Sequence, residues 1–134
     1  MTINYLAVLV TAAANFILGG LWYFPILFGK KWMALMNVTE EDIKKKGGAG
    51  KAYASTLFGA LLMASILAYF IGHVDATTAG DGARIGLYAW LGFVATTSLA
   101  NTMFESRPFG LYLINAGYNL VSLVIMGIIL AVWR

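Results

Sequence analysis

Four long apolar stretches follow one another along the chain, at about residues 3–28, 52–72, 84–104 and 110–133. Each has about the twenty residues that an α-helix needs to cross the hydrocarbon core of a bilayer. None alternates apolar and polar residues over a useful length, as a transmembrane strand does. The pattern therefore predicts an all-α, polytopic membrane protein. Its four transmembrane helices are expected to form an up-and-down bundle, as one domain over residues 1–134.

The connections between these stretches are polar. Residues 29–51 are predicted to form a cytoplasmic amphipathic loop, which opens with Lys30 and Lys31 and continues into apolar residues, as interfacial helices do. Thr39 precedes three acidic residues and is expected to cap a short helix there. In the shorter connection at residues 73–83, Asp81 is expected to cap the third long helix.

Small side chains recur every fourth residue in the second stretch and in parts of the first and third. Such a strip along one face of a helix lets a second helix approach closely. The helix-packing positions predicted on this basis are Gly19, Ala60, Ala64, Ala68, Gly72 and Gly92.

The composition agrees with a membrane protein and excludes several kinds of functional site. The chain is 60% hydrophobic and 11% charged, with a mean hydropathy of +0.79, whereas soluble domains carry about 25% charged residues. It has no Cys and a single His, His73, so disulfides, thiolate metal sites and thiol redox chemistry are excluded. We expect no metal, no cofactor and no nucleic-acid partner; the expected surroundings are the lipid bilayer.

The basic residues predict an orientation. The first and third connections between the apolar stretches, residues 29–51 and 105–109, share one side of the membrane. They carry seven of the basic residues: Lys30, Lys31, Lys44, Lys45, Lys46, Lys51 and Arg107. The other side carries only Arg84 and Arg134. Because cytoplasmic loops are enriched in Lys and Arg, the first side is predicted to be cytoplasmic. The protein is then expected in the bacterial cytoplasmic (inner) membrane as a multi-pass protein with both termini outside.

Polar side chains gather near the predicted turn between the last two helices. The candidate polar interior, or ligand or ion site, comprises Asn15, Asn101, Glu105, Arg107, Asn115, Tyr118 and Asn119. Amides facing lipid lose their water partners, so these groups are expected to point inward and bond one another. Two interpretations remain open: the amides hold the helices together, at about 0.6–2 kcal/mol each, or they form a ligand or ion site in which Glu105 handles protons or cations.

Short motifs along nearly the whole chain resemble those of a family of small bacterial four-helix membrane proteins, a domain of unknown function. The matching stretches are Gly20-Leu21-Trp22-Tyr23-Phe24-Pro25, Phe28-Gly29-Lys30, Trp32-Met33, Phe104-Glu105-x-Arg107 and Ile114-Asn115-x-Gly117-Tyr118. Phe24 stands where the family carries Ser, which removes a hydroxyl near Tyr23. The resemblance implies an integral membrane protein and no particular activity.

Three functions are compatible with these patterns. The first is a small solute or ion transporter or channel subunit that acts as a homo-oligomer, because four helices enclose little room. The alternative is a structural or accessory membrane protein that packs with itself or a partner. An intramembrane enzyme is disfavoured and we expect none, because the chain has no metal motif, no phosphate-binding loop and no nucleophile beside a base.

Overall fold

The computed structural model describes residues 3–45 and 50–133 of the chain, and in these ranges it is helical with no strand. The elements, in order, are α1 (Tyr5–Trp22), the π-helical turn η1 (Pro25–Gly29), α2 (Lys30–Met36), α3 (Glu40–Lys45), α4 (Gly50–His73), α5 (Ala79–Ala89), the π-helical segment η2 (Trp90–Ala95), α6 (Thr96–Phe104) and α7 (Phe109–Val132). Lys46 and Arg134, two of the basic residues that predict the orientation, lie outside the described residues.

Three helices, α1, α4 and α7, are long and apolar enough to cross a membrane. The third predicted helix takes another form. Its backbone is helical from residue 79 to residue 104, but η2 divides it into α5 and α6. Thus three crossings follow from helix length and composition, which is consistent with a multi-pass membrane protein.

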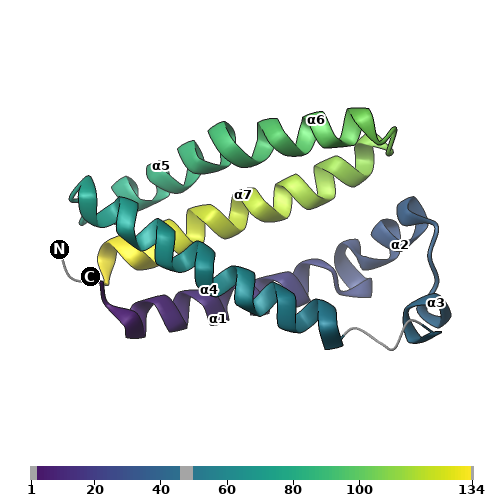
Figure 1. Cartoon of the computed structure of the whole chain (residues 1–134), viewed down its shortest axis with the longest axis horizontal. Coiled ribbons are helices and arrows are strands. Elements are labelled where there is room, and N and C mark those ends of the chain that lie inside the picture. Colours follow the sequence, from purple (N-terminus) through teal and green to yellow (C-terminus); the bar gives the residue numbers. More distant parts are fainter. Residues whose placement is uncertain (1–2, 46–49, 134) are drawn as a thin grey trace.

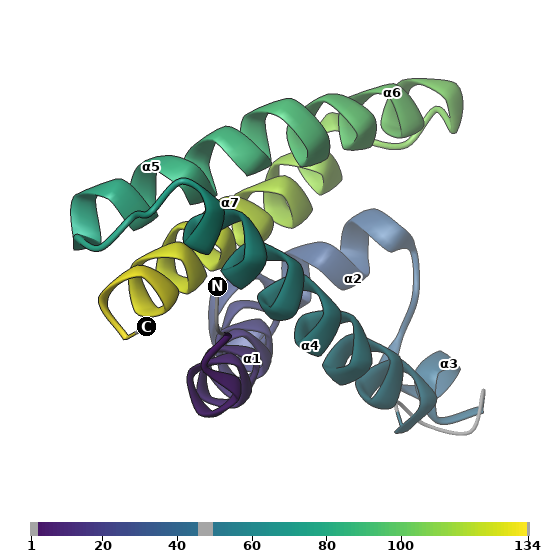
Figure 2. The ribbon, with the colours of Figure 1, turned by 60° about the vertical axis from the view of Figure 1, so that its left-hand side comes forward.

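The long elements pass back and forth along the molecule (Figure 1). The start of α1, the α4–α5 connection and the end of α7 lie at one end, whereas α2, α3 and the α6–α7 turn lie at the other. The combined α5–η2–α6 helix lies along α7, and α1 packs against both α4 and α7. Towards its first residues α4 diverges from α7 (Figure 2), and residues 50–59 of α4 are all exposed.

The core lies where α1 and α4 meet α7, and it combines alanines with larger apolar side chains. Ala7, Ala60, Ala64 and Met126 are buried in it. Of the predicted packing positions, Ala60 and Ala64 are therefore in the core, and Ala68, Gly72 and Gly19 are half-buried. Gly92 is exposed, and no described atom lies within 4 Å of the position of an added Cβ. Gly92 is therefore not a packing position against any other helix that the structure describes.

The closest helix–helix approach joins α5 to α7 through glycines that the four-residue strips do not include. A Cβ on Gly82 would lie 2.2 Å from the carbonyl oxygen of Gly127, and one on Gly86 would lie 2.2 Å from that of Leu123. These distances are far below contact, so the two backbones touch directly. Gly82 and Gly86 are four residues apart, the spacing that brings transmembrane helices into close contact.

Large apolar side chains cover much of the outside. Exposed examples occur on each of the long helices, among them Leu9, Phe58, Phe93 and Leu113. Soluble monomers rarely expose apolar patches of such extent. A lipid surrounding accounts for this surface, because lipid chains are as apolar as the side chains they touch.

Two helix ends differ from the expectation. The stretch expected as one helix over residues 3–28 ends at Trp22, where Phe24 takes an extended conformation before Pro25. The residue before a proline is disfavoured in helical geometry, which explains the break. The helix then restarts through η1, where Gly29 lies so close to the Tyr23 carbonyl oxygen that a Cβ would be 2.3 Å from it.

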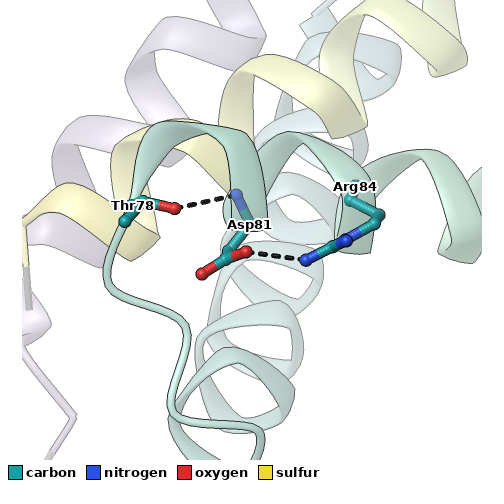
Figure 3. A network of polar contacts seen from close by, with 3 residues as sticks. All are labelled: Thr78, Asp81 and Arg84. Atoms are coloured by element: carbon teal, nitrogen blue, oxygen red, sulfur yellow. Dashed lines mark hydrogen bonds and ion pairs between the residues drawn. The ribbon is translucent and has the colours of Figure 1, made fainter.

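The sequence predicts Asp81 as the N-cap of the third long helix, but the N-cap of α5 is Thr78. The Thr78 hydroxyl accepts a hydrogen bond from the Asp81 backbone N–H at 3.1 Å. Asp81 instead lies in the first turn, where its carboxylate pairs with Arg84 at 2.7 Å (Figure 3). The predicted cap at Thr39 is confirmed: Thr39 and Asp42 exchange side chain–backbone hydrogen bonds at the start of α3.

Candidate functional site

The turn between α6 and α7 carries the two charged candidates side by side. Ser106 adopts a left-handed conformation, with φ of 55°, and the Arg107 backbone N–H returns to the Thr102 carbonyl at 3.1 Å. This closes the end of α6 in the manner of a left-handed helix cap. The Arg107 Nε then donates to Glu105 Oε2 at 2.7 Å, and the two side chains are 47% and 53% exposed, respectively.

Arg107 also reaches the chain segment that follows α1. Its Nη1 donates to the Met36 Sδ at 3.2 Å, on the last residue of α2. Leu35 packs near Gly110 at the start of α7, with 3.4 Å between a Leu35 methyl carbon and an added Cβ. The turn and α2 therefore support one another at the end of the molecule that holds Lys30 and Lys31.

Beside this turn, an open cleft of about 290 Å³ separates the facing sides of α6 and α7. One side chain in it is acidic, one is basic, and most of the others are neutral and polar. The lining residues are Ser98, Asn101, Thr102, Glu105, Arg107, Leu111, Tyr112 and Asn115. Four of the seven candidate polar residues from the sequence, Asn101, Glu105, Arg107 and Asn115, thus belong to one cleft.

The π-helical segment η2 precedes α6 and is bonded to α7 near the cleft. The Tyr112 hydroxyl donates to the carbonyl of Ala95, the last residue of η2, at 3.0 Å. In addition, the Trp90 indole N–H donates to the Ala116 carbonyl at 2.8 Å. These two bonds join the π-helical segment to α7 and hold α6 at its position beside the cleft. Single-turn π segments are frequent at functional sites.

A second polar group lies inside the molecule, between α1 and α7. Asn15 is buried, and its side-chain oxygen accepts hydrogen bonds from the hydroxyls of Tyr118, at 3.0 Å, and Ser122. The Tyr118 hydroxyl also reaches the Asn15 backbone carbonyl at 3.1 Å. Tyr118 packs close to Gly19, where an added Cβ would lie 3.0 Å from the Tyr118 oxygen. We call Asn15, Tyr118 and Ser122 the buried polar network.

Asn115 connects the cleft with the helix break after α1. The Tyr23 hydroxyl donates to Asn115 Oδ1 at 2.6 Å, and the neighbouring Trp22 indole N–H donates to the Ile114 carbonyl at 3.0 Å. The rings of Tyr23 and Tyr118 meet edge to face, with 5.6 Å between their centroids. The break at residues 23–24 thus positions Tyr23 to bond α7 where the cleft ends.

The remaining two asparagines make no side-chain hydrogen bond to any described residue. Asn101 is exposed on α6, and Asn119 is half-buried on α7. The expectation that the asparagines point inward and bond one another is therefore wrong in its details. Asn15 and Asn115 bond Tyr and Ser hydroxyls, and Asn101 opens onto the cleft.

Sequence reasoning missed Tyr112 as a lining residue of the cleft and gave Tyr23 and Ser122 no partner. The available signal was spacing. Asn115, Tyr118 and Ser122 are separated by three and four residues, so they lie on one face of α7. A hydroxyl on that face is a natural donor to an asparagine on the helix opposite, and the rotation of α1 decides which asparagine it meets.

The described residues hold no cluster of three or more His, Asp or Glu side chains that would suit a metal ion. The carboxylate of the cleft, Glu105, is already paired with a guanidinium. The arrangement provides one negative charge, one positive charge and several amide and hydroxyl groups. Chemically, it suits the binding of a small polar molecule.

Comparisons with known proteins identify the family. Searches of curated proteins and of solved structures find no match. Residues 6–131 match a family described as "Protein of unknown function (DUF1761)". The match covers nearly the whole chain and includes every residue of the cleft and of the buried polar network. The chain therefore belongs to the DUF1761 family of proteins of unknown function.

Proposed function

We propose that this protein is a multi-pass protein of the bacterial inner membrane in which residues 79–104 form a fourth crossing. At about 1.5 Å per residue, this helical run exceeds the thickness of the hydrocarbon core, which is about 30 Å. The end with Lys30, Lys31 and Arg107 then faces the cytoplasm, and both termini lie outside. The back-and-forth path of the chain in Figure 1 supports this up-and-down four-helix arrangement.

Within this arrangement, we propose that the α6–α7 cleft binds a small polar solute and is the cytoplasmic entrance of a transport path. The observation that carries the proposal is the cleft itself. It holds polar and charged side chains on a surface that is otherwise strongly apolar. Polar groups are costly at membrane depth and commonly mark substrate or ion pathways. Asn101, whose amide has no partner among the described residues, is the residue most directly available to a solute.

The path is proposed to be completed by a second copy of the chain. The interior of one copy is filled, since Ala64 and Met126 are fully buried and the buried polar network uses its hydroxyls internally. This packing among the described residues favours a solute route outside the contact of α1, α4 and α7. The cleft is instead open to the outside, where Asn101 is exposed, and Thr97 is exposed one turn earlier on α6. A homo-oligomer that pairs the open sides of two clefts would give each cleft its missing wall.

Solute uptake into liposomes that contain the purified protein tests this function. The assay compares small zwitterionic, cationic and anionic solutes. We expect uptake of at least one of them, and we expect Asn101→Leu to reduce its rate by about tenfold, because one lost solute hydrogen bond in a desolvated site corresponds to about 1.4 kcal/mol. Asn119→Leu removes the same amide outside the cleft and should leave the rate unchanged. The proposal would be contradicted if protein-free liposomes, or liposomes with the Asn101→Leu variant, took up the solutes as fast as liposomes with the wild type.

The buried polar network favours a second candidate, a structural or accessory membrane protein. Its hydrogen bonds join α1 to α7 and serve packing alone. If liposomes with the wild-type protein take up none of the solutes, the structural or accessory role is the better proposal. We do not propose an enzymatic activity, because the cleft has one carboxylate, one guanidinium and no His or Cys to act as base or nucleophile.

A further inference from the structure

We infer that the ligand of the α6–α7 cleft is a zwitterion, with an ammonium group close to a phosphate or carboxylate group. The inference rests on the proposed binding function and names the chemical class of its solute. Two sources share this chemistry: the phosphoethanolamine headgroup of a lipid, and a free amino-acid-like or phosphoethanolamine-like solute.

The first argument is the placement of the charges. Glu105 and Arg107 present one negative and one positive group side by side at the cleft, 2.7 Å apart and each about half exposed. A zwitterion replaces the Glu105–Arg107 ion pair with two new ion pairs. In one, the Glu105 carboxylate binds the ligand's ammonium group, and in the other the Arg107 guanidinium binds the ligand's phosphate or carboxylate group. A ligand with a single charge would bind one group and leave the other without its partner, which is unfavourable wherever water is partly excluded.

The second argument is that the existing pair is easy to open. An exposed ion pair contributes little free energy, so its exchange for a ligand costs little. The further contact of Arg107, with Met36 Sδ, uses a weak acceptor. This contact holds the guanidinium beside α2 without occupying it with a strong partner. Arg107 is thereby positioned and still available to an anionic group.

The third argument is the neutral lining and the size of the cleft. Asn101 and Asn115 add amide groups that can bond the ligand's oxygens and its ammonium hydrogens, and Leu111 and Tyr112 cover an apolar part. At about 290 Å³, the cleft is at the lower limit of pockets for drug-sized ligands, which measure about 300–1,000 Å³. It therefore suits a headgroup or an amino acid. Phe104, next to Glu105 and 92% exposed, offers an apolar surface to a lipid chain.

The chain contains a matched control for the charged pair. Asp81 and Arg84 also form an ion pair at 2.7 Å, at the opposite end of the molecule (Figures 1 and 3). That pair lies within the first turns of α5, at positions i and i+3, and neither residue lines the α6–α7 cleft. Its removal changes the same kinds of charge without touching the proposed site.

The test uses the full-length protein in phosphatidylglycerol nanodiscs and measures binding by calorimetry. The probes are phosphoethanolamine and glycine as zwitterions, inorganic phosphate as the anion alone, and ethanolamine as the ammonium alone. We expect a zwitterion to bind at least tenfold more tightly than phosphate or ethanolamine. Glu105→Gln and Arg107→Gln should each weaken its binding by about tenfold or more, whereas Asp81→Asn and Arg84→Gln should not.

A second arm distinguishes the two sources. If nanodiscs with phosphatidylethanolamine raise the melting temperature of the wild type and block phosphoethanolamine binding, the ligand is the lipid headgroup. If a soluble zwitterion binds equally in both kinds of nanodisc, the ligand is a free solute. Binding of phosphate or ethanolamine alone with the affinity of the zwitterions, unchanged binding by both Gln variants, or no binding of any probe would overturn the inference. Uptake of a singly charged solute that depends on Asn101 would overturn it as well and leave the proposed transport function standing.

Discussion

Replacing Gly82 with Ala is expected to lower the free energy of unfolding by about 3 kcal/mol or more, at the upper end of the range for overpacking. The added Cβ would lie 2.2 Å from the Gly127 carbonyl oxygen and 2.7 Å from the Ala131 Cβ. The nearest of these atoms belongs to backbone, so no side-chain rotation relieves the clash, and α5 must move away from α7. Reversible unfolding in mixed detergent and SDS micelles measures the loss.

Gly80→Ala is the matched control for this prediction. Gly80 lies two residues earlier on the same helix, and no described atom lies within 4 Å of its added Cβ. Ala has a higher helix propensity than Gly, by about 0.8–1.0 kcal/mol in a helix interior. The control should therefore be neutral or more stable than the wild type. Equal losses in the two variants would show that the α5–α7 contact is looser than the backbone distances indicate.

Asn15→Leu is expected to cost about 1–3 kcal/mol, the penalty for leaving buried hydrogen-bonding groups without a partner. Leu has a similar shape, but it removes the oxygen that accepts from Tyr118 and Ser122. The Tyr118 hydroxyl keeps the Asn15 backbone carbonyl as an acceptor, so the loss should stay within this range. The same unfolding assay measures it.

A double-mutant cycle identifies the cause. If the cost of Asn15→Leu comes from the Ser122 hydroxyl left without its acceptor, removing that hydroxyl with Ser122→Ala should recover part of it. The double variant Asn15→Leu with Ser122→Ala is then more stable than the sum of the single changes predicts. Strict additivity of the two changes would mean that Asn15 and Ser122 do not share a hydrogen bond in the folded protein.

Much of the fold was predictable from apolar runs and their limits. The helices expected at residues 52–72 and 110–133 are observed as α4 and α7, within about two residues at each end. The helix expected from residue 84 begins at Ala79 instead. Its first turn contains Gly80, Asp81 and Gly82, which read as a loop by composition. The direct contact of Gly82 with α7 makes helix favourable there, and no local pattern reports such a contact.

The candidate site was predictable only in part: Asn101, Glu105, Arg107 and Asn115 line the cleft, whereas Ser98, Thr102, Leu111 and Tyr112 were not among the candidates. Intramembrane polar residues were candidates because lipid does not solvate them, and this reasoning selected Asn15, Asn115 and Tyr118 correctly as partners in hydrogen bonds. Which of these groups are satisfied and which open onto a cleft depends on the rotation of each helix about its axis. Contacts between elements far apart in the sequence, such as the α5–α7 glycine contact and the Tyr23–Asn115 hydrogen bond, accompany the observed arrangement. A sequence pattern alone does not give it.

The central claim is that the polar residues form two groups, a buried network that stabilises the fold and a cleft that is kept for a ligand. The most direct test compares the thermal stability of Asn101→Leu and Asn15→Leu in nanodiscs. Asn101 is exposed and has no side-chain partner among the described residues, so Asn101→Leu should leave the melting temperature unchanged or raise it, as substitutions at functional sites often do. Asn15→Leu should lower it. An equal loss in both variants would contradict the account and assign Asn101 to packing.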